Sequence, residues 1–208
     1  GELIQLTSES FVDGARIPGE YAFGVMDRAA HVVPSTNRNP HLVWSDVPAG
    51  TKSFVLICHD PDVPGQGDDV NQKGREVPAS VPRVDFFHWT LVDIAASTRE
   101  IAAGEFSEGI TPRGKPGPQA PQGTRQGIND FTASDAPTSD DHFGYDGPCP
   151  PWNDAITHRY VFTLYALDTP HLAVSGRFTG PQVRRAMQGH VLAQAALMGT
   201  YTLNPNAV

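Results

Sequence analysis

Three segments of the chain bring together side chains that can bind a ligand or move a proton. They are Asp60-Pro61-Asp62, His88, and a glycine- and proline-rich loop at residues 144–151 that precedes His158 and Tyr160. Prolines fix the backbone φ angle, and glycines permit tight turns and close approach to a ligand. The loop alone would be interpreted as an ordinary surface turn, but the other two segments favour a binding site on a rigid loop.

The two histidines are suited to binding an anion. A neutral imidazole donates one hydrogen bond, and a protonated one donates two. A neighbouring carboxylate such as Asp60 would favour the imidazolium and fix its tautomer. Together with the Tyr160 hydroxyl and the backbone amide of Gly147, His88 and His158 would form a pocket for a phosphate group.

Other chemistries are open to the same residue types. Asp60 with His88 or His158 could act as general acid and base on a phosphate or ester. The same three residues could bind zinc, the pair Asp60 and Asp62 could bind a hard cation or cap a turn, and Cys149 could be a nucleophile. Because the chain lacks a Gly-x-Ser-x-Gly motif and zinc-ligand cysteine spacing, we predict no catalytic residue, no metal and no cofactor.

The order of these motifs resembles the phosphatidylethanolamine-binding protein family, in its bacterial, Raf kinase inhibitor-like branch. The matching segments are residues 44–54, 60–64, 88–89, 147–151, 158–160 and 199–201. The resemblance implies a pocket formed by Asp60, His88, Gly147, Pro148, His158, Tyr160 and Tyr201. It also implies that the first aspartate orients a histidine, with Asp62, Pro64 and Phe86 in supporting positions. Phe86 stands where animal relatives commonly have tryptophan.

The resemblance also implies a function without catalysis. The expected ligand is a phosphate-bearing small molecule or a phospholipid head group. A regulatory or inhibitory role toward a protein partner, a kinase or a protease, is a further expectation. The oligomeric state is left open, with a homodimer as one option.

Composition excludes several classes of protein. The 208 residues suffice for one domain, expected to span 1–208, and 20 glycines and 19 prolines favour a loop-rich β protein. A net charge of −8 without a basic cluster argues against nucleic-acid binding. No apolar run reaches the roughly 20 residues of a membrane helix. Without a recognisable signal peptide we expect a cytoplasmic protein, and a periplasmic or secreted one remains an option.

Short apolar runs separated by turn residues predict an all-β fold, a Greek-key β-sandwich with long loops. Residues 54–58 are apolar throughout, which indicates a strand buried on both faces, and residues 158–167 form the clearest strand. Pro61 and Pro64 favour a turn after the first of these strands. Two polar segments, 65–83 and 109–142, are either binding lids or solvated insertions.

The C-terminal part predicts a helix. Thr179 or Gly180 could cap it, with Pro181 in the first turn. Apolar residues then recur at spacings of three or four, which predicts one amphipathic helix that ends at Gly199. The residues of this stripe are Val183, Met187, Val191, Ala195 and Met198.

Overall fold

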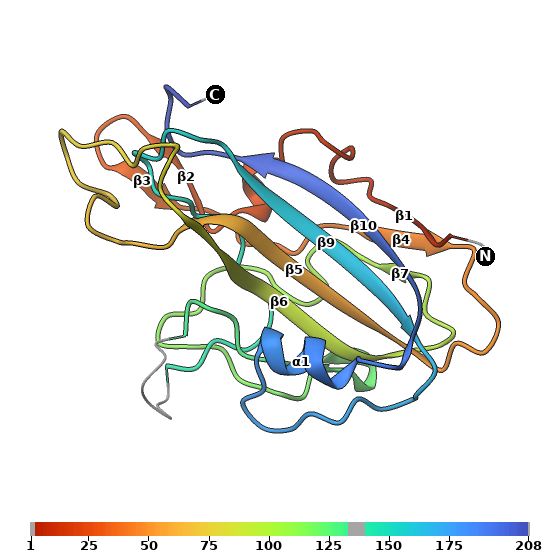
Figure 1. Cartoon of the computed structure of the whole chain (residues 1–208). Helices are drawn as coiled ribbons and strands as arrows, with labels where there is room; N and C mark the ends of the chain where they lie inside the picture. Colours follow the sequence, from red (N-terminus) through yellow and green to blue (C-terminus); the bar gives the residue numbers. More distant parts are fainter. Residues whose placement is uncertain (1–2, 133–139, 208) are drawn as a thin grey trace.

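The computed structural model describes residues 3–132 and 140–207, shown in Figure 1. The strands are β1 (Gln5–Thr7), β2 (Gly24–Asp27), β3 (His31–Pro34), β4 (Leu42–Ser45), β5 (Ser53–Pro64), β6 (Arg83–Ala95), β7 (Glu100–Ile101), β8 (Arg125–Gln126), β9 (His158–Leu167) and β10 (Val191–Tyr201). The helices are α1 (Gly180–Ala186) and the 3-10 turns η1 (Gly19–Tyr21) and η2 (Pro121–Gly123). None of the helices in these ranges is long and apolar enough to cross a membrane.

Two antiparallel sheets form the body of the molecule. The large sheet has the order β10-β9-β5-β6-β8, and the small sheet has the order β1-β4-β7. Side chains from both sheets share one core, in which Leu42 and Trp44 of β4 meet Phe54 and Leu56 of β5. This face-to-face packing of two sheets confirms the expectation of a mainly β sandwich.

Strand β5 is buried on both faces, as its apolar sequence predicts. Phe54 and Leu56 face the small sheet, whereas Val55 and Ile57 belong to a second cluster that includes Val183 of α1. Alternate residues of a strand point to opposite faces, so one uninterrupted apolar run serves both layers. Figure 1 shows α1 packed against the large sheet beside β6.

The predicted C-terminal helix is wrong beyond its first two turns. Helix α1 begins as expected, with Thr179 as N-cap in a capping box, but it ends at Ala186. A turn with Gly189 at φ +83° follows, and residues 191–201 then form β10, which pairs with β9. Gly199 lies inside this strand against Ile17 rather than at a helix end.

The expected turn at Asp60-Pro61-Asp62 is also wrong, because β5 continues through it to Pro64. The pairing of β5 with β6 is irregular between Asp60 and Val63, and pairing with β9 ends at His59. A proline is tolerated there because its missing N–H falls where the ladder is already interrupted. The long segment after it connects β5 to β6, and residues 133–139 of the segment 109–142 lie outside the described residues.

Candidate anion-binding site

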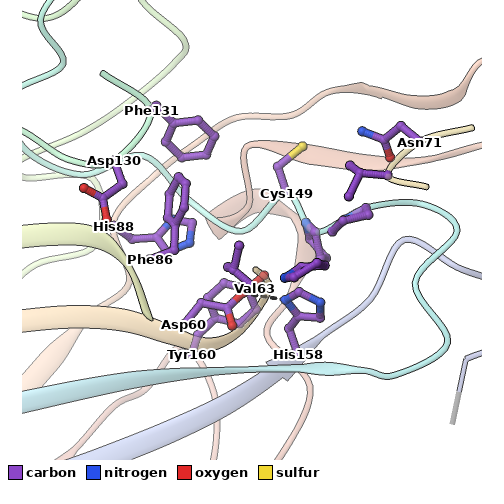
Figure 2. A pocket seen from close by; sticks show the side chains of 14 residues that line it. Asp60, Val63, Asn71, Phe86, His88, Asp130, Phe131, Cys149, His158 and Tyr160 are labelled. Carbon is purple, nitrogen blue, oxygen red and sulfur yellow. Dashed lines mark hydrogen bonds and ion pairs between the residues drawn. The ribbon is translucent and has the colours of Figure 1, made fainter. Parts of the chain in front are cut away.

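A cavity of about 370 Å³ opens where the end of β5 meets the beginnings of β6 and β9 (Figure 2). Its lining residues are Asp60, Val63, Pro64, Val70, Asn71, Phe86, His88, Asp130, Phe131, Cys149, Pro150, Pro151, His158 and Tyr160. Most of these side chains are apolar, and four of the polar ones, Asp60, His88, His158 and Tyr160, lie on strands of the large sheet. Such a concave, largely apolar space with a few polar groups is typical of a small-molecule site.

Strand pairing explains why residues far apart in the sequence meet here. The register of β5 against β6 places Asp60 opposite Phe86, and His88 lies two residues further along the same face. In β9, His158 and Tyr160 likewise alternate with an outward-facing residue, and both line the cavity. The period of two in strands therefore brings one carboxylate, two imidazoles and one phenol to a single point.

His158 is held between two carboxylates at the base of the cavity. Its Nδ1 donates to Asp60 Oδ2 at 2.6 Å and its Nε2 donates to Asp154 Oδ2 at 2.7 Å. Arg83 in turn donates to both carboxylate oxygens of Asp154, at 2.5 and 3.0 Å. We call these four residues, Asp60, His158, Asp154 and Arg83, the relay.

The relay fixes the charge of His158. Burial alone would lower its pKa, but the hydrogen bonds to Asp154 and Asp60 outweigh burial and raise the pKa to about 9. His158 is therefore an imidazolium at neutral pH, yet both of its N–H groups are already used. The expectation that His158 donates to a bound anion is corrected accordingly, and neither nitrogen is left for a zinc ion.

His88 is in the opposite state. Its Nδ1 donates to the backbone carbonyl of Asp146 at 2.7 Å, and because a carbonyl cannot donate, this bond fixes the tautomer. The Asp146 carboxylate is itself anchored by Asn37 and Asn129, each at 2.8 Å. Burial lowers the pKa of His88, with the charge of Asp60 acting in the opposite direction. His88 is thus neutral, and its Nε2 presents a lone pair at the cavity.

Three further polar groups lack a partner at this cavity within the described residues. The Tyr160 hydroxyl is buried without a hydrogen-bond partner, and burial followed by the charge of Asp60 raises its pKa well above its ordinary value. Asn71 accepts from the Trp152 amide through Oδ1, which leaves its side-chain N–H groups unpaired. Cys149 has the one backbone N–H among residues 148–151, and no hydrogen bond of the described chain engages it.

Asp130 places a second carboxylate on the cavity wall. Its Oδ2 accepts from the Phe87 amide at 2.8 Å, and burial raises the pKa of this carboxyl group while that hydrogen bond opposes the change. The ring of Phe131 lies next to it and meets Phe86 edge-on, with ring centroids 5.0 Å apart. Figure 2 shows Asp130, Phe131, Phe86 and His88 on one side of the cavity and His158 on the other.

Three residues expected at the pocket are not among those that line it. The Gly147 amide donates to Asn37 Oδ1 at 2.7 Å, so it is not available to an anion. The Pro148 carbonyl accepts from Phe23, and the Tyr201 hydroxyl donates to the Gly24 carbonyl at 2.7 Å. These groups join the loop and β10 to residues 23–37, which is a structural role.

Of the three residues expected in supporting positions, Asp62 lies outside the cavity lining, whereas Pro64 and Phe86 are part of it. Asp62 points away from the cavity and binds Arg159 through the backbone amide and the guanidinium, at 2.8 to 3.0 Å. Burial would raise the pKa of Asp62, but the Arg159 hydrogen bonds prevail and lower it. Pro64 and Phe86 form part of the cavity wall itself.

Sequence reasoning missed the residues that loops contribute. Asn153 joins two of these loops, because its side chain accepts from the Asn71 amide and donates to the carbonyls of Asp69 and Arg75. Both long segments contribute to the cavity wall, since Val70 and Asn71 belong to 65–83 and Asp130 and Phe131 belong to 109–142. Asp154 was the one missed residue with a signal, since it precedes His158 by four positions.

Comparisons with known proteins agree with the fold. Residues 7–202 match the family model described as "Phosphatidylethanolamine-binding protein". The UPF0098 protein YbhB of Escherichia coli is 32% identical over 200 residues, 96% of this chain and 100% of YbhB. A UPF0098 protein of Aquifex aeolicus is 34% identical over 97% of this chain and 90% of its own length.

Two solved structures are similar along the whole chain. The crystal structure of E. coli YbcL, described as a member of the mammalian PEBP family, has a TM-score of 0.69 at 27% identity and covers 96% of this chain and 98% of YbcL. The PEBP homologue CT736 of Chlamydia trachomatis has a TM-score of 0.65 at 31% identity, covering 97% and 98%.

Proposed function

Because the chain belongs to the phosphatidylethanolamine-binding protein family, we propose that its cavity binds the phosphate group of a small molecule or phospholipid head group. One observation carries the proposal. The Tyr160 hydroxyl, which is buried without a protein partner, and the free Nε2 of His88 belong to side chains that line the same cavity. An unpaired buried polar group costs about 1–3 kcal/mol, which a ligand that supplies the missing hydrogen bonds would recover.

The donors suit an oxyanion. Tyr160 contributes O–H, Cys149 contributes a backbone N–H, and Asn71 contributes a side-chain N–H at the rim. His88 becomes a further donor when it takes up a proton. The relay adds no net charge, because two carboxylates offset the imidazolium and the guanidinium. The cavity thus recognises a phosphate through directed hydrogen bonds, and affinity for the free ion is weak because few atoms are buried.

The same geometry leaves two of the candidate catalytic groups, His158 and Cys149, unsuited to turnover. A general base must accept a proton from substrate or water, and both His158 nitrogens are occupied by carboxylates. A cysteine nucleophile must ionise, and burial raises the pKa of the Cys149 thiol to about 11. Neither group is prepared for the acid–base or nucleophilic roles that an enzyme would assign to it.

The test is an NMR titration of the histidine side chains with inorganic phosphate. We expect the His88 resonances to move and those of His158 to move much less, because only His88 has a free nitrogen at the cavity. Tyr160→Phe should weaken binding about tenfold by removing one donor. Tyr201→Phe is the matched control, because its hydroxyl bonds the Gly24 carbonyl outside the cavity. Saturating phosphate that leaves His88 unmoved would rule out the proposed site.

A further inference from the structure

We propose that the cavity selects a phosphate group that brings its own proton, a phosphate monoester, over sulfate esters and phosphodiesters. This proposal rests on the proposed function and specifies its ligand. The feature that carries it is the tautomer of His88, which presents a hydrogen-bond acceptor at the cavity. A fully ionised anion also has only acceptors, so it cannot donate to this nitrogen. A ligand O–H is the group that satisfies this lone pair directly.

The orientation of His88 is strongly constrained. Its Nδ1 donates to the Asp146 carbonyl, and the Asp146 amide donates back to the His88 carbonyl at 3.2 Å. Asn37 and Asn129 hold the Asp146 carboxylate from the far side. A flip of the imidazole would leave a buried carbonyl without a donor, so the ring is held with Nε2 toward the ligand.

The charges around His88 also oppose a ligand without a proton. The titratable groups that face it or share its cavity are Asp60 of β5, His158 and Tyr160 of β9, and Asp130, Asp146 and Cys149 of the connection between β8 and β9. The charge of His158 is already shared by Asp60 and Asp154. A fully ionised ligand therefore meets the Asp130 carboxylate and the His88 lone pair, without a proton to place between the ligand and that lone pair.

The proton could instead come from solvent and reside on His88. Burial makes that route costly, since it lowers the pKa of His88 below the ordinary histidine value. A phosphate monoester holds its second proton with a pKa of about 6 and can deliver it as P–O–H. A sulfate monoester is a similar tetrahedral ion, but it carries no proton at this pH. In a phosphodiester the corresponding oxygen is bonded to a second carbon and has no proton to donate. The intact diester of a phospholipid is thus a poorer ligand than a free monoester.

The experiment compares three small probes by calorimetry at about pH 6, where roughly half of a phosphate monoester keeps its second proton. The monoanion of methyl phosphate has the same charge as methyl sulfate and a similar shape. The two ions differ in that methyl phosphate keeps one O–H proton. Dimethyl phosphate represents the diester of a lipid head group. We expect methyl phosphate to bind at least about tenfold more tightly than either of the other two. We expect methyl sulfate to gain affinity as the pH is lowered, because His88 then takes up a proton and becomes a donor.

Two variants connect the selectivity to the residues. In His88→Gln the side-chain amide can offer an N–H to the ligand, so the preference for methyl phosphate should shrink to about threefold or less. His59→Gln is the matched control, because His59 also lies in the large sheet but does not line the cavity, and the preference should remain. Should His88→Gln fail to fold, Asp130→Asn provides the second test. It removes a carboxylate from the wall and should raise the affinity for methyl sulfate.

The possible outcomes separate the two proposals. If methyl sulfate binds within about threefold of methyl phosphate at pH 6, the proton requirement is wrong while the anion site remains. If His59→Gln changes the preference as much as His88→Gln does, His88 is not the group responsible. If no probe binds between about pH 5 and 8, the proposed function itself fails.

Discussion

Raising the pH should destabilise this protein by removing the proton that His158 holds between Asp60 and Asp154. The folded-state pKa of His158 is raised to about 9, against an ordinary histidine value of 6.5. The folded state therefore binds this proton more tightly than the unfolded chain does. The resulting stability is fully present below about pH 6.5 and is lost as the pH rises through about 9.

The size of the effect follows from the two pKa values. One pKa unit corresponds to about 1.4 kcal/mol, so the difference between 6.5 and about 9 is worth about 3 kcal/mol. His158 is 0% exposed, so solvent screens this interaction little. A domain is stable by only about 5–15 kcal/mol in total, and the loss should be visible as a shift of the denaturation midpoint.

The assay is urea unfolding followed by tryptophan fluorescence at intervals from about pH 6 to pH 8, below the range in which ionisation of the two cysteines in the unfolded chain would add to the effect. We expect the unfolding free energy to fall by about 2 kcal/mol in wild type over this range. His158→Gln should be less stable at about pH 6 and should lose this pH dependence. His190→Gln, which breaks an exposed pair with Asp168, should retain it. The claim that the His158 proton stabilises the fold would be refuted by a wild-type unfolding free energy that does not change over this pH range. It would also be refuted if His158→Gln lost stability with pH as steeply as wild type.

Three other outcomes follow from the geometry. Tyr160→Phe should leave the unfolding free energy unchanged or raise it by up to about 1 kcal/mol in denaturant titration, because it removes a buried hydroxyl without a partner. Gly147→Ala should destabilise by about 2 kcal/mol or more in the same assay, because a Cβ there would lie 2.3 Å from the Tyr21 carbonyl oxygen. Cys149 should react with iodoacetamide about a hundredfold more slowly than a free thiol at neutral pH, since burial raises its pKa to about 11.

The local sequence was sufficient to predict the central strands β5 and β9, and it was insufficient to predict the last strand, β10. Residues 54–58 of β5 form a continuous apolar run, β9 is mainly apolar from Tyr160 onward, and burial on both faces leaves few alternatives to a strand. Residues 191–201 fit two periods, because Val191, Ala195 and Met198 suit a helix while Ala193, Ala195 and Leu197 suit a strand. Pairing with β9 decides between them, and that contact is made with a distant segment.

The residues of the site could also be predicted only in part from the local sequence. Motifs could indicate Asp60, His88, His158 and Tyr160, because each lies on a strand whose face is set by alternation. They could not indicate Asn71, Asp130 or Phe131, which come from long loops without periodicity. They also misassigned Gly147, because the choice of which amide is free depends on where the Asn37 side chain lies after folding.

The two motif histidines show why residue type does not determine role in this cavity. His158 and His88 lie on strands flanking β5, yet one is held charged by two carboxylates and the other is neutral. The hydrogen-bond acceptors decide the outcome, because two carboxylates outweigh the burial of His158, whereas the charge of Asp60 and one carbonyl do not outweigh the burial of His88. One histidine therefore supplies a fixed charge that stabilises the fold, and the other retains a nitrogen for the ligand. The proposed preference for a ligand that carries a proton thus originates in the backbone carbonyl of Asp146, which fixes the tautomer of His88.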